Sequence, residues 1–181
     1  MASPSKEEQI LKLILENSPL KEWHFEEIIR ESKVTKAAAN KWLKKYVKDG
    51  ILHHVKESGK FPYFTVGKSN PFYSAKKRFY ALKQLYESRL IAELLLSPKI
   101  KTAILFGSFA RGDWYKNSDI DLFIVGSGFK KQQLELKLNR QIELHTFRNI
   151  GEIKQVQNSL LKNVINGYII KGDVSEIAGL L

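Results

Sequence analysis

Two aspartates that lie two positions apart in an apolar segment constrain this chain of 181 residues more than any other feature. Asp119 opens the segment, and Asp121 stands inside it between Ile120 and Leu122. In a β-strand, residues two apart point to the same face, so both carboxylates face the same side. Adjacent carboxylates repel each other, which raises one pKa or attracts a cation. Capping of a turn would explain Asp119, but it leaves Asp121 unexplained within the predicted strand Asp119–Val125.

A second apolar segment, Ile100–Phe106, predicts a buried strand that ends at Gly107-Ser108. A strand that ends in Gly-Ser before a helix exposes backbone N–H groups and a hydroxyl at the positive end of that helix, where phosphate binds well. The Gly-Lys-Ser/Thr ending of a P-loop is missing. Gly-Ser is a weak indication alone, and the aspartate pair that follows it makes the combination specific.

A third carboxylate, Glu143, lies in another predicted strand, Gln141–Phe147, after a short predicted helix over Lys130–Leu138. Its neighbours Ile142 and Leu144 must face the opposite side of the sheet. If the two strands are close, three carboxylates converge, which is costly without a cation. Mg²⁺ suits such a site, because it is typically bound by one or two carboxylates together with substrate phosphates.

The spacing of these residues resembles a known family. Gly107-Ser108, ten residues and then Asp119-x-Asp121 match the GSx10DxD signature of the minimal nucleotidyltransferases, in the DNA polymerase β superfamily. The resemblance covers roughly residues 99–172 and extends to other positions, namely Arg111-Gly112, Ser118 and the ending Asn166–Ile170, which resembles the last strand of the family. It implies an α/β unit with a mixed sheet that binds a nucleoside triphosphate and Mg²⁺.

The resemblance also implies a role for each matching residue. For Arg111 an alternative stays open, because a surface arginine packed on Trp114 explains it equally well. The implied reaction is two-metal transfer of a nucleoside monophosphate, with ATP as the expected substrate, to an acceptor hydroxyl, and pyrophosphate leaves. The implied nucleotide-binding residues are Gly107, Ser108 and Arg111, and the implied catalytic and metal-binding residues are Asp119, Asp121 and Glu143, with two Mg²⁺ ions in the active complex.

Two features depart from the family pattern. The third carboxylate is Glu143, where members commonly have Asp, so its reach differs by one methylene group. The short connection between Val125 and Gln141, together with the few residues after Gly172, leaves no room for an acceptor-binding domain. We therefore expect the acceptor to lie on another protein or a nucleic acid.

The N-terminal region has the element order of a winged helix-turn-helix domain. Helices are predicted over Ser5–Glu16, over about His24–Glu31, and over Lys36–Lys48 with Thr35 as a cap. Strands are predicted over Ile51–Lys56 and Tyr63–Val66, joined as a hairpin. His53 and His54 are adjacent and point to opposite faces, so they do not share a metal.

Lysines recur along one side of the third predicted helix, opposite its apolar side. Within this element order, contact with duplex DNA is a somewhat better interpretation of these lysines than a merely solvated face. Lysine side chains favour contact with phosphates over readout of base edges. The aromatic residues beside the basic hairpin tip, Phe61, Tyr63 and Phe64, are expected to pack within the hairpin rather than to form a platform on which bases stack. The residues predicted to contact DNA are Lys36, Asn40, Lys41, Lys44, Lys45, Lys48 and Lys60.

A single long helix is predicted over Tyr73–Leu96, with an apolar stripe that includes Phe79, Leu82, Leu85, Tyr86 and Leu90. The predicted fold class is therefore α+β. The predicted domains are a winged helix-turn-helix over residues 1–70, a connecting helix over 71–98 and a nucleotidyltransferase unit over 99–181.

Composition narrows the function classes further. The net charge of +11 suggests a polyanionic partner or substrate, and cysteine is absent, which excludes disulfides, cysteine-ligated zinc and thiol catalysis. No apolar run approaches the length of a membrane helix, and the first residues are polar, so we expect a cytoplasmic protein with no membrane partner. Three functions stay open: an active nucleotidyltransferase, for example one that adenylylates a partner protein; a DNA-binding regulator whose transferase unit senses nucleotide or is inactive; and a structural adaptor.

Overall fold

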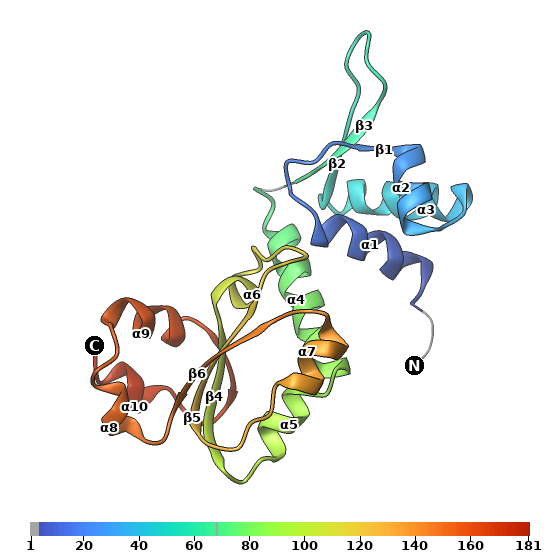
Figure 1. Ribbon diagram of the computed structural model, residues 1–181. Helices are drawn as coiled ribbons and strands as arrows, with labels where there is room; N and C mark the ends of the chain where they lie inside the picture. The colour runs from blue at the N-terminus through green and yellow to red at the C-terminus, as the bar shows by residue number, and fades with distance from the viewer. Residues whose placement is uncertain (1–3, 68) are drawn as a thin grey trace. The chain divides into compact units, whose positions relative to one another are not determined.

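The computed structural model describes residues 4–67 and 69–181, and it forms two compact units, Met1–Lys77 and Arg78–Leu181. The division falls inside helix α4 (Pro71–Glu87), which Figure 1 labels.

The first unit combines three helices with a small antiparallel sheet. The predicted helices are present as α1 (Lys6–Glu16), α2 (Phe25–Ser32) and α3 (Lys36–Lys48). The predicted hairpin is also present, as β2 (Leu52–Val55) and β3 (Tyr63–Val66). A third strand, β1 (Trp23–His24), pairs with β3 and gives the order β1-β3-β2. The sequence does not predict β1, because two residues are too few to show the alternation of apolar and polar side chains that marks a strand.

Capping residues set where the helices of this unit begin. The hydroxyl of Ser5 accepts a hydrogen bond from the Glu8 backbone N–H, and the Glu8 side chain accepts one from the Ser5 backbone, which completes a capping box at α1. Thr35 caps α3 through the Ala38 backbone N–H, as predicted. These helices bury apolar side chains from one face each, among them Ile10, Ile14, Ile28, Leu43 and Tyr46.

The predicted single helix over 73–96 is wrong, since α4 ends at Glu87 and α5 (Leu90–Leu96) follows. Arg89 adopts the left-handed conformation, with φ of 73°, which an α-helix cannot continue through. The hydroxyl of buried Ser88 donates to the Leu85 carbonyl and so closes the end of α4. The predicted apolar stripe is also incomplete, because Phe79 and Tyr86 are exposed.

The second unit is built on a mixed four-stranded sheet, as predicted. Its strands are β4 (Ile100–Phe106), β5 (Ile120–Gly126), β6 (Ile142–Phe147) and β7 (Tyr168–Lys171), in the order β6-β5-β4-β7. Strands β5 and β6 are parallel, and the other pairs are antiparallel. Helix α7 (Gln132–Leu138) belongs to the crossover that a parallel pair requires.

One face of this sheet is covered by three short C-terminal helices, α8 (Ile150–Ile153), α9 (Asn158–Ile165) and α10 (Ser175–Ala178) (Figure 1). These helices were not predicted from the sequence. The core on this face consists of Ile104, Phe106, Phe123, Val125, Ile153, Leu161, Val164 and Ile177. Because residues two apart share a face, Asp121 lies on the same face as Phe123 and Val125, at the start of β5. In the described part of the chain, no helix has the length and hydropathy needed to cross a membrane.

Candidate active site

Asp121 occupies the centre of the candidate site because it is paired on both sides. Phe106, the last residue of β4, is its antiparallel partner, and Glu143 of β6 is its parallel partner. Register neighbours point to the same face, so Asp121 and Glu143 lie side by side, as the sequence predicts. Asp121 is half-buried, whereas Asp119 precedes β5 and is exposed.

Gly107 begins α6 (Gly107–Arg111) directly after β4 and packs against the carboxylate of Asp121. Its φ is +66°, in the left-handed region, and a Cβ added there would overlap Oδ2 of Asp121. Both the backbone conformation and the close approach therefore require glycine at this position. Half-buried Ser108 follows Gly107 at the start of the same short helix.

The electrostatic surroundings raise the pKa of Asp121. Burial is the largest cause, and repulsion from Glu143 and Asp119 adds to it, while His145 and Arg111 act in the opposite direction. The carboxylates of Asp119 and Asp121 are oxygen ligands of the type that Mg²⁺ prefers, and a cation would relieve their repulsion. The donor chemistry therefore fits a magnesium ion that completes its coordination with phosphate oxygens.

Glu143 makes a different contact in the structure. Its Oε1 lies 3.3 Å from Nε2 of His145, which stands two residues further along the same face of β6 and meets the ring of Phe106 edge-on. Within residues 4–67 and 69–181, no group of three or more acidic, histidine or cysteine side chains forms a ready metal site. Asp119, Asp121 and Glu143 as a three-carboxylate set thus stay a prediction.

Arg111 lies at the end of α6 and pairs with Asp113 at 3.1 Å, Nε to Oδ2. Trp114, the packing partner that the sequence left open for Arg111, is buried and stacks on Phe109 and Tyr80, with ring centroids 5.3 and 6.1 Å apart. Arg111 is close enough to Asp121 to oppose, as the smallest of the causes, the rise in the pKa of that carboxyl.

Asp119 lines a polar cavity of about 950 Å³ at the start of β5 and β6. Two tethers hold the beginning of β6 at this cavity. Glu135 of α7 accepts a hydrogen bond from the Ile142 backbone N–H at 2.9 Å, and Lys131 donates to the Ile142 carbonyl at 2.7 Å. Since Glu143 is the next residue, these bonds fix its backbone position.

Arg140, which is only 9% exposed, was not predicted from the sequence as part of the site. Its guanidinium donates to three backbone carbonyls in the segment before Asp119, those of Tyr115, Lys116 and Ser118. It also lies over the rings of Phe109 and Trp114, 5.2 Å from each centroid. Arg140 thereby joins the segment that carries Asp119 to helix α6, and no periodicity in the sequence marks a lone arginine before a strand for this role.

The predicted DNA contacts in the first unit fall into two groups. Three of the lysines form ion pairs, Lys36 with Glu26, Lys45 with Asp49, and Lys60 with Glu57. The other four residues, Asn40, Lys41, Lys44 and Lys48, are exposed on α3, and Lys41 lies over the ring of Trp42. The pairing lowers the net positive charge that the first group offers to a phosphate.

Comparisons with known proteins bear on the class of enzyme. Residues 89–174 match the family model described as polymerase beta, nucleotidyltransferase. They therefore form a polymerase β-like nucleotidyltransferase domain, and the enzyme class predicted from the motif is confirmed.

One curated relative is a protein of Methanocaldococcus jannaschii that is named provisionally as a protein adenylyltransferase. It is 50% identical to this chain over 46 residues, which are 25% of this chain and 36% of the relative. The match thus spans about a third of the relative's length. A solved structure, titled as a toxin-antitoxin with AMP-PNP, is 20% identical and covers 57% of this chain and 79% of that one. Its TM-score is 0.35, too low for an argument about function.

Gly107→Ala tests the packing against Asp121. We expect it to lower affinity for ATP with Mg²⁺ by at least about tenfold, because the added methyl group displaces the carboxylate, and to add about 1–2 kcal/mol of left-handed strain. Gly128→Ala is the matched control, since Gly128 also has a positive φ, of +82°, but only an ordinary contact with Lys99. Titration calorimetry and chemical denaturation measure both effects. Equal ATP affinity in the two variants would contradict the assignment.

Asp121→Asn tests the electrostatic interpretation. Because the folded-state pKa of Asp121 is raised, its ionised form destabilises the fold, and the variant should be more stable by about 0.2–1 kcal/mol at neutral pH without metal. The difference should shrink as the pH falls through the raised pKa and vanish below the pKa of unfolded Asp. Thermal unfolding against pH measures it, with Glu176→Gln, an exposed carboxylate, as control. A stability gain that does not depend on pH would refute burial and charge repulsion as its cause.

Proposed function

We propose that this chain transfers AMP from ATP to a hydroxyl group of a partner protein, in a Mg²⁺-dependent reaction. The observation that carries the proposal is the meeting of Gly107, Asp121 and Glu143 at the adjoining ends of three strands. Anionic side chains beside a backbone turn that can hold phosphate are what nucleotidyl transfer requires.

Each residue has a separate task in this proposal. The backbone N–H groups of the Gly107-Ser108 turn and the Ser108 hydroxyl bind the triphosphate. Asp119 and Asp121 hold the Mg²⁺ that the nucleotide brings, which when bound neutralises charge on the phosphates. Glu143 accepts the proton of the acceptor hydroxyl, whose oxygen forms a bond to the α-phosphorus while the bond to the leaving pyrophosphate breaks.

Two observations favour AMP and a protein acceptor. The relative with 50% identity over 46 residues carries a provisional name as a protein adenylyltransferase. The cavity beside Asp119 is open and polar and is lined by side chains of varied character, including Lys131, Glu135 and exposed Leu136. Such a surface suits a loop of another macromolecule better than a small sugar, which needs converging polar groups in an enclosed pocket.

Glu143→Gln tests the proposed reaction. With ATP labelled at the α-phosphate, Mg²⁺ and cell lysate, the wild-type chain should label an acceptor protein, and the variant should do so about 10²-fold more slowly, the scale for loss of a general base. ATP binding by calorimetry should be largely retained, because Asp119 and Asp121 are intact.

Two controls make this experiment specific. ATP labelled at the γ-phosphate should give no labelling beyond that of lysate without the chain, which separates AMP transfer from phosphoryl transfer. A chelator should abolish both ATP binding and labelling. A variant that transfers at the wild-type rate would remove Glu143 from the reaction. Binding of ATP without any transfer would favour a regulator that senses the nucleotide.

Duplex DNA is a second candidate partner, for the first unit interpreted as a winged helix-turn-helix domain. The observation that favours it is the row of exposed lysines on α3, Lys41, Lys44 and Lys48, which have no ion-pair partner in the described part of the chain.

Replacing Lys41, Lys44 and Lys48 together by Ala should weaken DNA binding and reduce the slope of log K against log salt by up to about 0.9 for each phosphate that the variant no longer neutralises. Fluorescence anisotropy with a labelled duplex at several salt concentrations measures the slope. Lys12→Ala, on exposed α1 surface, is the control. An unchanged slope in the triple variant would leave these lysines as a solvated face.

A further inference from the structure

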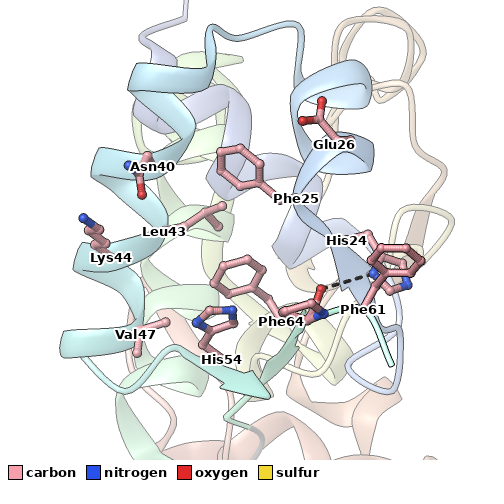
Figure 2. Close-up of a pocket in the computed structure, with 11 residues that line it drawn as sticks. His24, Phe25, Glu26, Asn40, Leu43, Lys44, Val47, His54, Phe61 and Phe64 are labelled. Atoms are coloured by element: carbon pink, nitrogen blue, oxygen red, sulfur yellow. Dashed lines mark hydrogen bonds between the residues drawn. The ribbon is translucent and has the colours of Figure 1, made fainter. Parts of the chain in front are cut away.

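The first unit contains a groove of about 840 Å³ that includes two of the predicted DNA contacts, Asn40 and Lys44, but is otherwise lined mostly by apolar side chains. It runs between α3, the beginning of α2 and the β2–β3 hairpin (Figure 2). Its lining residues are His24, Phe25, Glu26, Asn40, Leu43, Lys44, Val47, His54, Phe61, Pro62 and Phe64.

Apolar groups make up most of the groove wall. Phe25, Leu43, Val47 and Phe64 approach it from three different elements, and the ring of His54 stacks on that of Phe64, 4.6 Å between centroids (Figure 2). At one end Phe61 is 85% exposed. An exposed aromatic side chain beside an apolar groove marks a surface whose burial by a ligand is favourable.

The charge at the groove is positive once the internal pairs are counted. Glu26 is held by Lys36, with 2.8 Å between Oε1 and Nζ. Lys44 has no ion-pair partner among residues 4–67 and 69–181, and it lines the groove from α3. Lys41 and Lys48, three residues before and four residues after it, lie one turn away on the same face of the helix. A ligand that covers the groove therefore gains from a carboxylate next to Lys44.

We propose that this groove binds a linear segment of a partner protein, which inserts bulky apolar side chains between α3 and the hairpin and places an acidic residue beside Lys44. The volume is that of a ligand site and holds a few such side chains. A nucleic-acid backbone fits this wall poorly, because phosphates placed against Phe25, Val47 and Phe64 would lose water that these apolar side chains do not replace. The groove lies wholly within the first unit, so the proposal does not depend on nucleotidyl transfer.

A library of displayed 12-residue peptides, selected on the full chain, identifies the preferred ligand. We expect enriched peptides that combine bulky apolar residues with Asp or Glu. A labelled enriched peptide is then titrated by fluorescence anisotropy against four variants, which form two matched pairs.

The first pair tests the apolar wall. Phe61→Asp should weaken peptide binding about tenfold or more, whereas Leu20→Asp, at an apolar residue 78% exposed outside the groove lining, should not change it. Both residues are on the surface, so loss of folding does not confuse the result, and ATP binding should be the same in both variants.

The second pair tests the charge. Lys44→Glu should weaken binding of the acidic peptide about tenfold and favour a peptide in which Lys replaces the acid, whereas Lys48→Glu, outside the groove lining, should weaken it clearly less. Failure to enrich any peptide, or equal binding to Phe61→Asp and Leu20→Asp, would overturn the proposal. The proposal would also be overturned if a 20-base-pair duplex displaced the peptide and bound Lys44→Glu and Lys48→Glu with equally reduced affinity, since that result would assign the face to DNA. A dimer in sedimentation that Phe61→Asp dissociates would overturn it too and assign the face to a second copy.

Discussion

The candidate active site depends on the close packing of Gly107 against the carboxylate of Asp121. β4 ends at Phe106, opposite Asp121, and the chain can turn into α6 at that point only because Gly107 has no side chain and accepts a positive φ. The same turn thus places backbone donors for phosphate next to an acidic residue that stands inside an apolar sheet. Neither group alone would suit nucleotide binding, because bound phosphates need a cation to balance their charge, and burial and repulsion disfavour the ionised form of Asp121 unless a cation is near.

A second layer of residues keeps these groups in place. Arg140 holds the carbonyls of the segment before Asp119 and lies on the rings of Phe109 and Trp114, and it is a buried cation whose donors are directed at backbone oxygens. A buried charge is tolerated where it is hydrogen-bonded, and in return it restricts the segment to one geometry. Residues that touch no substrate therefore define where Asp119 lies.

The sequence predicts the candidate carboxylates of the site better than the residues that hold them in place. Asp119, Asp121 and Glu143 could be found because a carboxylate in an apolar strand violates the usual pattern, and a period of two then gives its direction. Arg140 violates no pattern, and its contacts join segments more than 20 positions apart. The break at Ser88 and Arg89 was missed because the apolar spacing runs through it, and left-handed arginine has no signature in composition. Strand β1 and the groove beside α3 likewise arise only when distant segments pair.

The contact between Glu143 and His145 defines where the third candidate carboxylate lies in the structure. Without a ligand, Glu143 is repelled by Asp121 and turns toward the imidazole 3.3 Å away, which its extra methylene group, compared with Asp, helps it to reach. A cation at Asp121, which the proposed reaction would require, would replace this repulsion by attraction. The Glu143 side chain is over half exposed, so solvent also reaches it. The carboxylate of Glu143 is therefore set by its contact with His145, while the backbone of β6 beside it is fixed by the bonds of Lys131 and Glu135 to Ile142.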